Sequence, residues 1–135
     1  MLAPVLHLII WTLIVWAWMY ALRIPAMQKA GIDPQDALHP GSLDKLPTSA
    51  RCAADNYNHL HEAPTLFYAL AIYTHLAGQA DGLNVGLAWA YVALRIGHSL
   101  AQIVVKNVTL RFGLFALSTI VLIVITARNL IALAS

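Results

Sequence analysis

The chain has 135 residues, of which 60% are hydrophobic and 10% are charged, and its formal net charge is +2. Soluble domains have about 25% charged residues, so this chain has too few to cover a surface exposed to water. The same composition excludes intrinsic disorder, the small net charge argues against nucleic-acid binding, and one cysteine excludes an internal disulfide framework. The composition therefore indicates an integral membrane protein in contact with membrane lipids.

Four helical spans are expected in a single transmembrane domain that covers residues 1–135. A bilayer core of about 30 Å needs about 20 predominantly apolar residues of helix. Three apolar segments meet this requirement, at residues 2–22, 83–105 and 110–131. The apolar run 65–76 is too short alone, so the second span is predicted over 49–77, with a kink at Pro64.

The connections predict an all-α, up-down four-helix bundle. The first connection, residues 31–47, cannot be continuous helix because it holds several prolines and glycines: Gly31, Pro34, Pro40, Gly41 and Pro47. The other two, residues 78–82 and 106–109, are short, and short connections join antiparallel neighbours.

The basic residues predict the orientation of the bundle. Those near the first and third connections are Arg23, Lys29, Lys45, Arg51, Lys106 and Arg111. The second connection has none and contains Asp81. The positive-inside rule then places the first and third connections in the cytoplasm and both termini outside it. Arg128 departs from this pattern, and its long side chain is expected to reach the membrane–water interface. In a bacterial cell the protein would lie in the inner membrane.

Two polar stripes interrupt the apolar spans. Each has the spacing i, i+4, i+7, i+11 that forms one helix face: Arg51, Asp55, Asn58 and Glu62 on the second helix, and Tyr91, Arg95, His98 and Gln102 on the third. An ionisable group inside the membrane costs about 2–3 kcal/mol or more, so the stripes should face each other, a partner subunit or a wet cavity.

A second interpretation stays open, in which the stripes only form interhelical ion pairs, such as Arg51 with Asp55 and Arg95 with Glu62. His98 is expected to hydrogen-bond the carboxylates of the second helix. No metal site is expected, because His59 and His61, two residues apart on a helix, point in different directions. The tryptophans of the first helix, Trp11, Trp16 and Trp18, are interpreted as lipid-facing.

These residues resemble a known family. Residues 51–64, RCAADNYNHLHEAP, are similar to the helix-two signature of the MAPEG superfamily, membrane-associated proteins in eicosanoid and glutathione metabolism. Residues 91–98, YVALRIGH, resemble the family's R-x-x-H on helix three. Arg111 falls where catalytic members carry an Arg at the start of helix four. The resemblance, to a bacterial-type member, covers essentially the whole chain.

The resemblance implies a homotrimer that binds glutathione as co-substrate between adjacent subunits, near the cytoplasmic face. It assigns Arg111 to the thiolate-stabilising position and places the following residues at the glutathione site or its frame: Arg51, Asn58, Glu62, Arg95 and His98. The side-chain chemistry agrees, because guanidinium groups clamp carboxylates and a nearby cation lowers a thiol pKa from about 8.5. The set of binding candidates also includes the remaining residues of the two stripes: Asp55, Tyr91 and Gln102.

The implied function is a glutathione-dependent transferase or peroxidase that acts on lipophilic electrophiles or hydroperoxides arriving from the bilayer. The alternative is a non-catalytic lipid-binding or partner protein on the same scaffold, because some catalytic members have a Tyr where this chain has Gln102 or a neighbour of it. In that case Arg111 is only a topology anchor, as basic residues at cytoplasmic helix ends often are.

Overall fold

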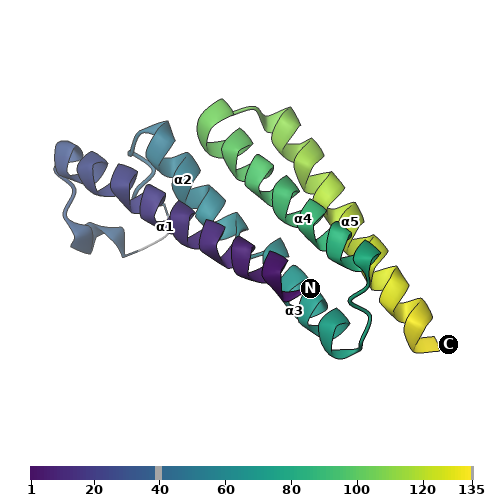
Figure 1. Ribbon diagram of the computed structural model, residues 1–135. Helices are drawn as coiled ribbons and strands as arrows, with labels where there is room; N and C mark the ends of the chain where they lie inside the picture. The colour runs from purple at the N-terminus through teal and green to yellow at the C-terminus, as the bar shows by residue number, and fades with distance from the viewer. Residues whose placement is uncertain (39–40, 135) are drawn as a thin grey trace.

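The computed structural model describes residues 1–38 and 41–134, and the chain folds only into helices and connections over these residues. The helices are α1 (Leu2–Ala30), the 3₁₀-helix η1 (Pro34–Ala37), α2 (Thr48–His59), α3 (Ala63–Leu76), α4 (Gly82–Leu100), the π-helix η2 (Ala101–Val105) and α5 (Val108–Ala134). The long helices run antiparallel, and both termini lie at the same end (Figure 1). The predicted all-α bundle is confirmed; Pro40 of the first connection lies outside the described residues.

In the described part of the chain, three helical segments are long and apolar enough to cross a membrane: α1, α4 together with η2, and α5. Their outer faces carry large apolar side chains, among them Leu13, Ile123 and Ile131, which are 60%, 61% and 71% exposed. Apolar exposure on this scale marks a surface that contacts lipid. The chain is therefore an integral membrane protein. α1 is longer than the predicted span 2–22, because it passes Pro25 and ends only at Gly31, whose φ is 63°.

The predicted second helix is broken rather than kinked. α2 ends at His59 and α3 begins at Ala63, with Pro64 in its first turn. In a continuous helix the proline ring would clash with the carbonyl of residue 60, and its missing N–H would leave that carbonyl unpaired. Thr65 starts the new helix by donating from its N–H and its Oγ1 to the Glu62 carbonyl, at 3.1 and 2.5 Å. The membrane crossing over 49–77 stays a prediction.

The core lies where α1 meets α3 and α4. Leu8 and Val15 of α1 are fully buried, as are Phe67 of α3 and Tyr91 of α4. The rings of Phe67 and Tyr91 stack with their centroids 4.4 Å apart. This packing fixes which face of α4 turns inward.

Two of the three tryptophans do not face lipid as predicted. Trp11 is partly buried and donates from Nε1 to Ser99 Oγ at 3.1 Å, and Trp18 packs against the core. Trp16 is 46% exposed and keeps a lipid-facing position. The difference arises because α1 buries one face against α4, and a tryptophan N–H seeks a partner when its ring is buried.

Arg128 has partners at the start of α4, and its expected place at the membrane–water interface stays a prediction. Its Nη2 pairs with the Asp81 carboxylate at 2.5 Å, and its Nε donates to Asn84 Oδ1 at 2.8 Å. Asp81 also caps α4 by accepting from the Asn84 N–H. The charge of Arg128, which departs from the pattern of basic connections, is thus balanced by the carboxylate of Asp81 in the α3–α4 turn.

Candidate functional site

The polar stripe of α4 and η2 lies inside the subunit. Tyr91, Arg95, His98 and Gln102 are 0%, 1%, 4% and 4% exposed. They share the inward face with small and apolar residues such as Ala88. The predicted binding residues of the third span therefore belong to the subunit's own polar core.

The stripe of α2 points outward. The side chains of Arg51 and Glu62 are 51% and 67% exposed, and Asp55 and Asn58 are also exposed. The buried face of α2 is instead formed by Ala50, Ala53 and Asn56. Small alanines let α1 approach α2 closely, which turns the charged face away. Within one subunit the two stripes therefore do not face each other, and burial of the second helix's stripe against a partner subunit or a wet cavity stays a prediction.

Two hydrogen bonds connect the α2 segment to the buried stripe. Asn56 Nδ2 donates to Gln102 Oε1 at 3.1 Å, and Arg95 Nη2 donates to the His59 carbonyl at 3.0 Å. Gln102 lies in the π-helix η2, an irregularity that often occurs at functional sites. The sequence analysis did not identify Asn56. The sequence contained one indication, a single amide side chain on the same helix face as Ala50 and Ala53.

The ion pairs of the second interpretation are not formed. Arg51 lies 3.8 Å from Asp44, and Glu62 lies 3.0 Å from Nδ1 of His59. Within the described residues, no carboxylate lies within 4 Å of the Arg95 guanidinium. Arg51 therefore pairs with the first connection, and Glu62 pairs with the last residue of α2.

The buried layer contains polar atoms without a hydrogen-bond partner in the described part of the chain. They are Asn56 Oδ1, Tyr91 OH, Arg95 Nε and Nη1, and His98 Nδ1. The predicted bond from His98 to a carboxylate of the second helix is therefore wrong. Because native structures satisfy most buried polar groups, a cluster of such atoms inside a membrane span points to function.

A first polar hollow, here called the α1–α2 hollow, opens between α1, the first connection and α2. Its volume is about 410 Å³. It brings together two guanidinium groups and two carboxylates, with one amide: Arg23, Arg51, Asp44, Asp55 and Asn58. Opposite charges in one hollow fit a ligand that carries both carboxylates and an ammonium group. Glutathione is such a ligand.

A second hollow, here called the Arg111 hollow, has a volume of about 250 Å³. Its lining comes from the α2–α3 junction, α4 and α5: His59, Glu62, His98, Val108, Arg111, Phe112 and Phe115. Arg111 lies in the first turns of α5, which Asn107 caps by accepting from the Leu110 N–H at 3.0 Å. The cation and the positive end of the helix dipole therefore favour an anion here.

His59 also lines this hollow, although the sequence analysis did not count it among the site residues. Its ring centroid lies 6.1 Å from that of His98, and its Nδ1 contacts Glu62. Among the described residues, no group of three His, Cys, Asp or Glu side chains is placed to hold a metal ion. His61 bonds the Tyr57 carbonyl instead.

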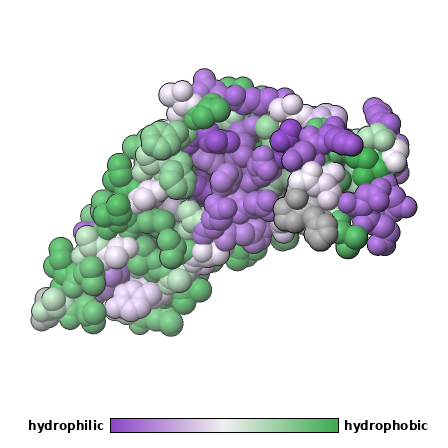
Figure 2. All heavy atoms as spheres, turned by 180° about the vertical axis from the view of Figure 1, so that it is seen from behind, coloured by the Kyte–Doolittle hydropathy of each residue, from purple (hydrophilic) through white to green (hydrophobic). Residues whose placement is uncertain are grey.

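The two hollows have no lining residue in common. One chain alone therefore keeps Arg111 apart from Arg51, Asp55 and Asn58. Figure 2 shows hydrophilic side chains gathered over one half of the molecule, while the other half is hydrophobic. Glu62 and His98 lie with Arg111, whereas Tyr91, Arg95 and Gln102 line neither hollow.

The comparison with protein families gives one finding. The model of the MAPEG family matches residues 1–131, a range that includes the residues of both hollows and of the buried polar layer. Neither the curated proteins nor the solved structures give a match.

Proposed function

The chain belongs to the MAPEG family of membrane proteins, and we propose that it is a glutathione-dependent transferase or peroxidase for lipophilic electrophiles or hydroperoxides. The family membership supports a role in glutathione or eicosanoid metabolism. The observation that carries the finer proposal is the division of polar groups between the α1–α2 hollow and the Arg111 hollow. Each hollow holds part of what a glutathione reaction needs.

The two parts would be joined by assembly. In a homotrimer with cyclic symmetry, one surface of each subunit meets a different surface of the next. We propose that the α1–α2 hollow of one subunit adjoins the Arg111 hollow of its neighbour. Both termini would lie outside the cytoplasm, in a bacterial inner membrane, and the composite site would lie near the cytoplasmic face.

The side chains of the α1–α2 hollow suit glutathione. The guanidinium of Arg51 would hold a carboxylate, Asp55 would hold the ammonium group, and Asn58 would bond a peptide group. Arg95 was predicted to clamp the other carboxylate, but it is buried on the His59 carbonyl. In this proposal Arg95 holds the end of α2 in position, while Arg23 provides a second cation in the hollow.

Arg111 supplies the reactivity. A free thiol has a pKa of about 8.5, so a cation and a helix N-terminus beside it are needed to favour the thiolate near neutral pH. The imidazoles of His59 and His98 line the same hollow, and the proton that the thiol releases would pass to water. The hydrophobic rings of Phe112 and Phe115 would face the lipophilic substrate.

The alternative, a non-catalytic lipid-binding or partner protein, is favoured by one observation. Gln102 stands where some catalytic members have a Tyr, and its side chain is occupied by Asn56 inside the subunit. The enzyme and the non-catalytic protein would share the same scaffold. The formation of glutathione thiolate on the protein therefore distinguishes the two functions.

Subunit mixing tests the composite site. Arg51→Ala damages the α1–α2 hollow and Arg111→Ala damages the Arg111 hollow. Trimers made of either variant alone should therefore conjugate glutathione poorly. Mixed trimers should regain activity, because some interfaces combine an intact α1–α2 hollow with an intact Arg111 hollow. Native mass spectrometry would confirm that the mixed species are trimers.

The matched control is a mixture of Arg51→Ala with Asn58→Ala. Both changes lie in the same hollow, so every interface stays damaged and activity should not return. A monomeric wild-type protein, or mixed trimers that stay inactive, would contradict the composite site.

A further inference from the structure

Arg111 lies in its hollow without an ion pair of its own. In the described part of the chain no carboxylate lies within 4 Å of its guanidinium, and Glu62, which lines the same hollow, pairs with His59. The place of this cation therefore depends on the backbone of α5. A thiolate at the hollow depends on that place, because the attraction between two charges falls with their distance.

Hydrogen bonds hold α5 to the bundle at its far end. Asn129 Nδ2 donates to Thr74 Oγ1 of α3 at 2.9 Å, and Arg128 pairs with Asp81 of the α3–α4 turn. Among the described residues, no hydrogen bond joins the first five turns of α5 to another helix. The half of α5 that carries Arg111 is therefore held in another way.

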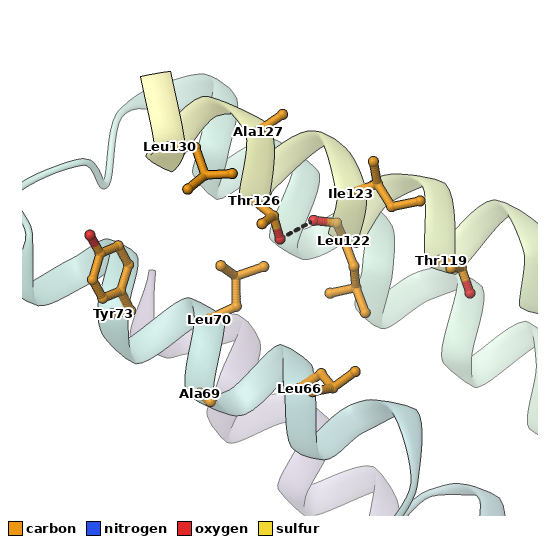
Figure 3. A pocket seen from close by; sticks show the side chains of 10 residues that line it. All are labelled: Leu66, Ala69, Leu70, Tyr73, Thr119, Leu122, Ile123, Thr126, Ala127 and Leu130. Atoms are coloured by element: carbon orange, nitrogen blue, oxygen red, sulfur yellow. Dashed lines mark hydrogen bonds between the residues drawn. The ribbon is translucent and has the colours of Figure 1, made fainter. Parts of the chain in front are cut away.

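The sides of α5 give this half little directional support. An apolar groove of about 650 Å³ separates α5 from α3, and Figure 3 shows Leu70 and Leu122 pointing into it. On the other side Leu114 packs beside Gly97 of α4, where a Cβ would lie 3.7 Å from Leu114 Cδ1. Apolar contacts are non-directional, so they do not by themselves fix the rotation of a helix.

The joint between α4 and α5 is the remaining support. Lys106, which follows η2, has a φ of 58° and a ψ of 32°, a left-handed conformation that residues other than glycine rarely adopt. Asn107 then starts α5, because its Oδ1 accepts from the Leu110 N–H at 3.0 Å and its carbonyl accepts from the Arg111 N–H at 3.1 Å. Such a backbone conformation persists only where the surrounding structure fixes it. The direction of α5 is therefore set by whatever holds η2.

η2 is held by burial and by one hydrogen bond to α2. Three consecutive residues, Ala101, Gln102 and Ile103, are buried, whereas one face of an α-helix buries residues three or four apart. Gln102 Oε1 accepts from Asn56 Nδ2 at 3.1 Å, and these two residues are 4% and 0% exposed. A directional bond between two buried amides thus fixes the π-helical turn against α2.

We propose that Asn56 and Gln102 are positioning residues for the thiolate. Their bond holds η2 against α2, and through Lys106 and the Asn107 cap it sets where the Arg111 guanidinium lies. This inference rests on the proposed function and adds to it two residues that line neither hollow. Without the bond, the π-helical turn relaxes and the start of α5 shifts relative to the bound sulfur.

The test removes the bond and measures the thiolate. Asn56→Leu with Gln102→Leu, here called the leucine pair, leaves neither buried amide without its partner. Thiolate absorbance is recorded against pH in detergent at saturating glutathione. The pKa of the bound thiol should rise by about one unit, a tenfold loss of thiolate at low pH, because the cation is displaced. Glutathione affinity should stay within about a factor of three, since the α1–α2 hollow is unchanged.

Exchanging the two amides supplies the rescue. Asn56→Gln with Gln102→Asn keeps one longer and one shorter side chain, so the bond forms again and the thiol pKa should return to that of the wild type. Gln102→Asn alone shortens the acceptor and should raise the pKa as the leucine pair does. This comparison decides the question even if the leucine pair does not fold.

The matched control is Thr74→Val with Asn129→Leu, which removes another buried hydrogen-bonded pair. Asn129 lies about 27 Å from Arg111 along α5, at about 1.5 Å per residue, so this control should leave the thiol pKa unchanged. An equal rise in the control would overturn the proposal, because it would show a general effect of lost stability. An exchanged pair that behaves like Gln102→Asn alone would also overturn it.

The wild type separates the two proposals. If it forms thiolate, and the leucine pair and Gln102→Asn form thiolate at the same pKa, the positioning role is wrong and the proposed function stands. If the wild type forms no thiolate, both are wrong.

Discussion

Arg95 donates a hydrogen bond from Nη2 to the main-chain carbonyl of His59, at 3.0 Å. His59 is the last residue of α2, and the last carbonyls of a helix lack intrahelical partners and carry partial negative charge. Pro64 ends α2, and Arg95 caps the end thus created. One buried guanidinium therefore joins the broken second segment to α4, next to the Arg111 hollow.

Replacing Arg95 by Met should not destabilise the ligand-free protein. One hydrogen bond to a charged donor contributes about 1.5–3 kcal/mol, whereas burying an ion costs several kcal/mol, so Arg95→Met should be neutral or stabilising by up to about 2 kcal/mol. The same variant should lose the rise in melting temperature that glutathione gives the wild type, because the end of α2 is no longer held. Thermal unfolding in detergent, with and without glutathione, measures both.

Arg95→Lys is the control for this prediction, since it keeps the charge without the planar guanidinium. A large drop in melting temperature for ligand-free Arg95→Met would instead show that the cap is mainly structural.

The Asn56–Gln102 bond should behave as a coupled pair. Asn56→Leu alone or Gln102→Leu alone leaves a buried amide without its partner, at a cost of about 1–3 kcal/mol. The double variant should cost clearly less than the sum of the two, because both amides are gone. The coupling is measured by chemical unfolding of the wild type, the two single variants and the double variant. Strictly additive losses of unfolding free energy would contradict it.

Arg111→Ala should abolish thiolate formation while leaving glutathione affinity within about a factor of three, because its interaction is with the charged sulfur that the thiol lacks. Stopped-flow mixing with glutathione, followed by ultraviolet absorbance of the thiolate, measures the first quantity, and equilibrium binding measures the second. Arg51→Ala is the matched comparison and should weaken binding by about 2–4 kcal/mol. If Arg111 is only a topology anchor, the variant changes orientation or expression and leaves the thiolate signal intact.

The orientation prediction concerns both ends of the chain. Reporter fusions after the last helix should give a non-cytoplasmic signal, and reporters in residues 41–47 a cytoplasmic one, because the basic residues gather near the first and third connections. Arg128→Gln should not change this result, since Arg128 is paired with Asp81. A cytoplasmic signal at the C-terminus would move the two polar hollows to the opposite face of the membrane.

The all-α membrane bundle and the family could both be predicted from the amino-acid sequence. Long apolar runs such as 2–22 allow few alternatives, since every backbone polar group in lipid must be bonded within the segment. The motif residues Arg95, His98 and Arg111 carry the family resemblance through spacing alone, and the family match over residues 1–131 confirms it.

The direction in which each polar stripe faces could not be predicted from the sequence and became visible in the folded subunit. Helical spacing shows that Arg51 and Glu62 share a face, but it does not show which face of α2 is buried. In the folded subunit the buried face is the one with Ala50, Ala53 and Asn56. The break at Pro64 then left a carbonyl that Arg95 reaches only in the folded subunit. These outcomes depend on contacts between helices distant in the chain, which spacing along one helix does not encode.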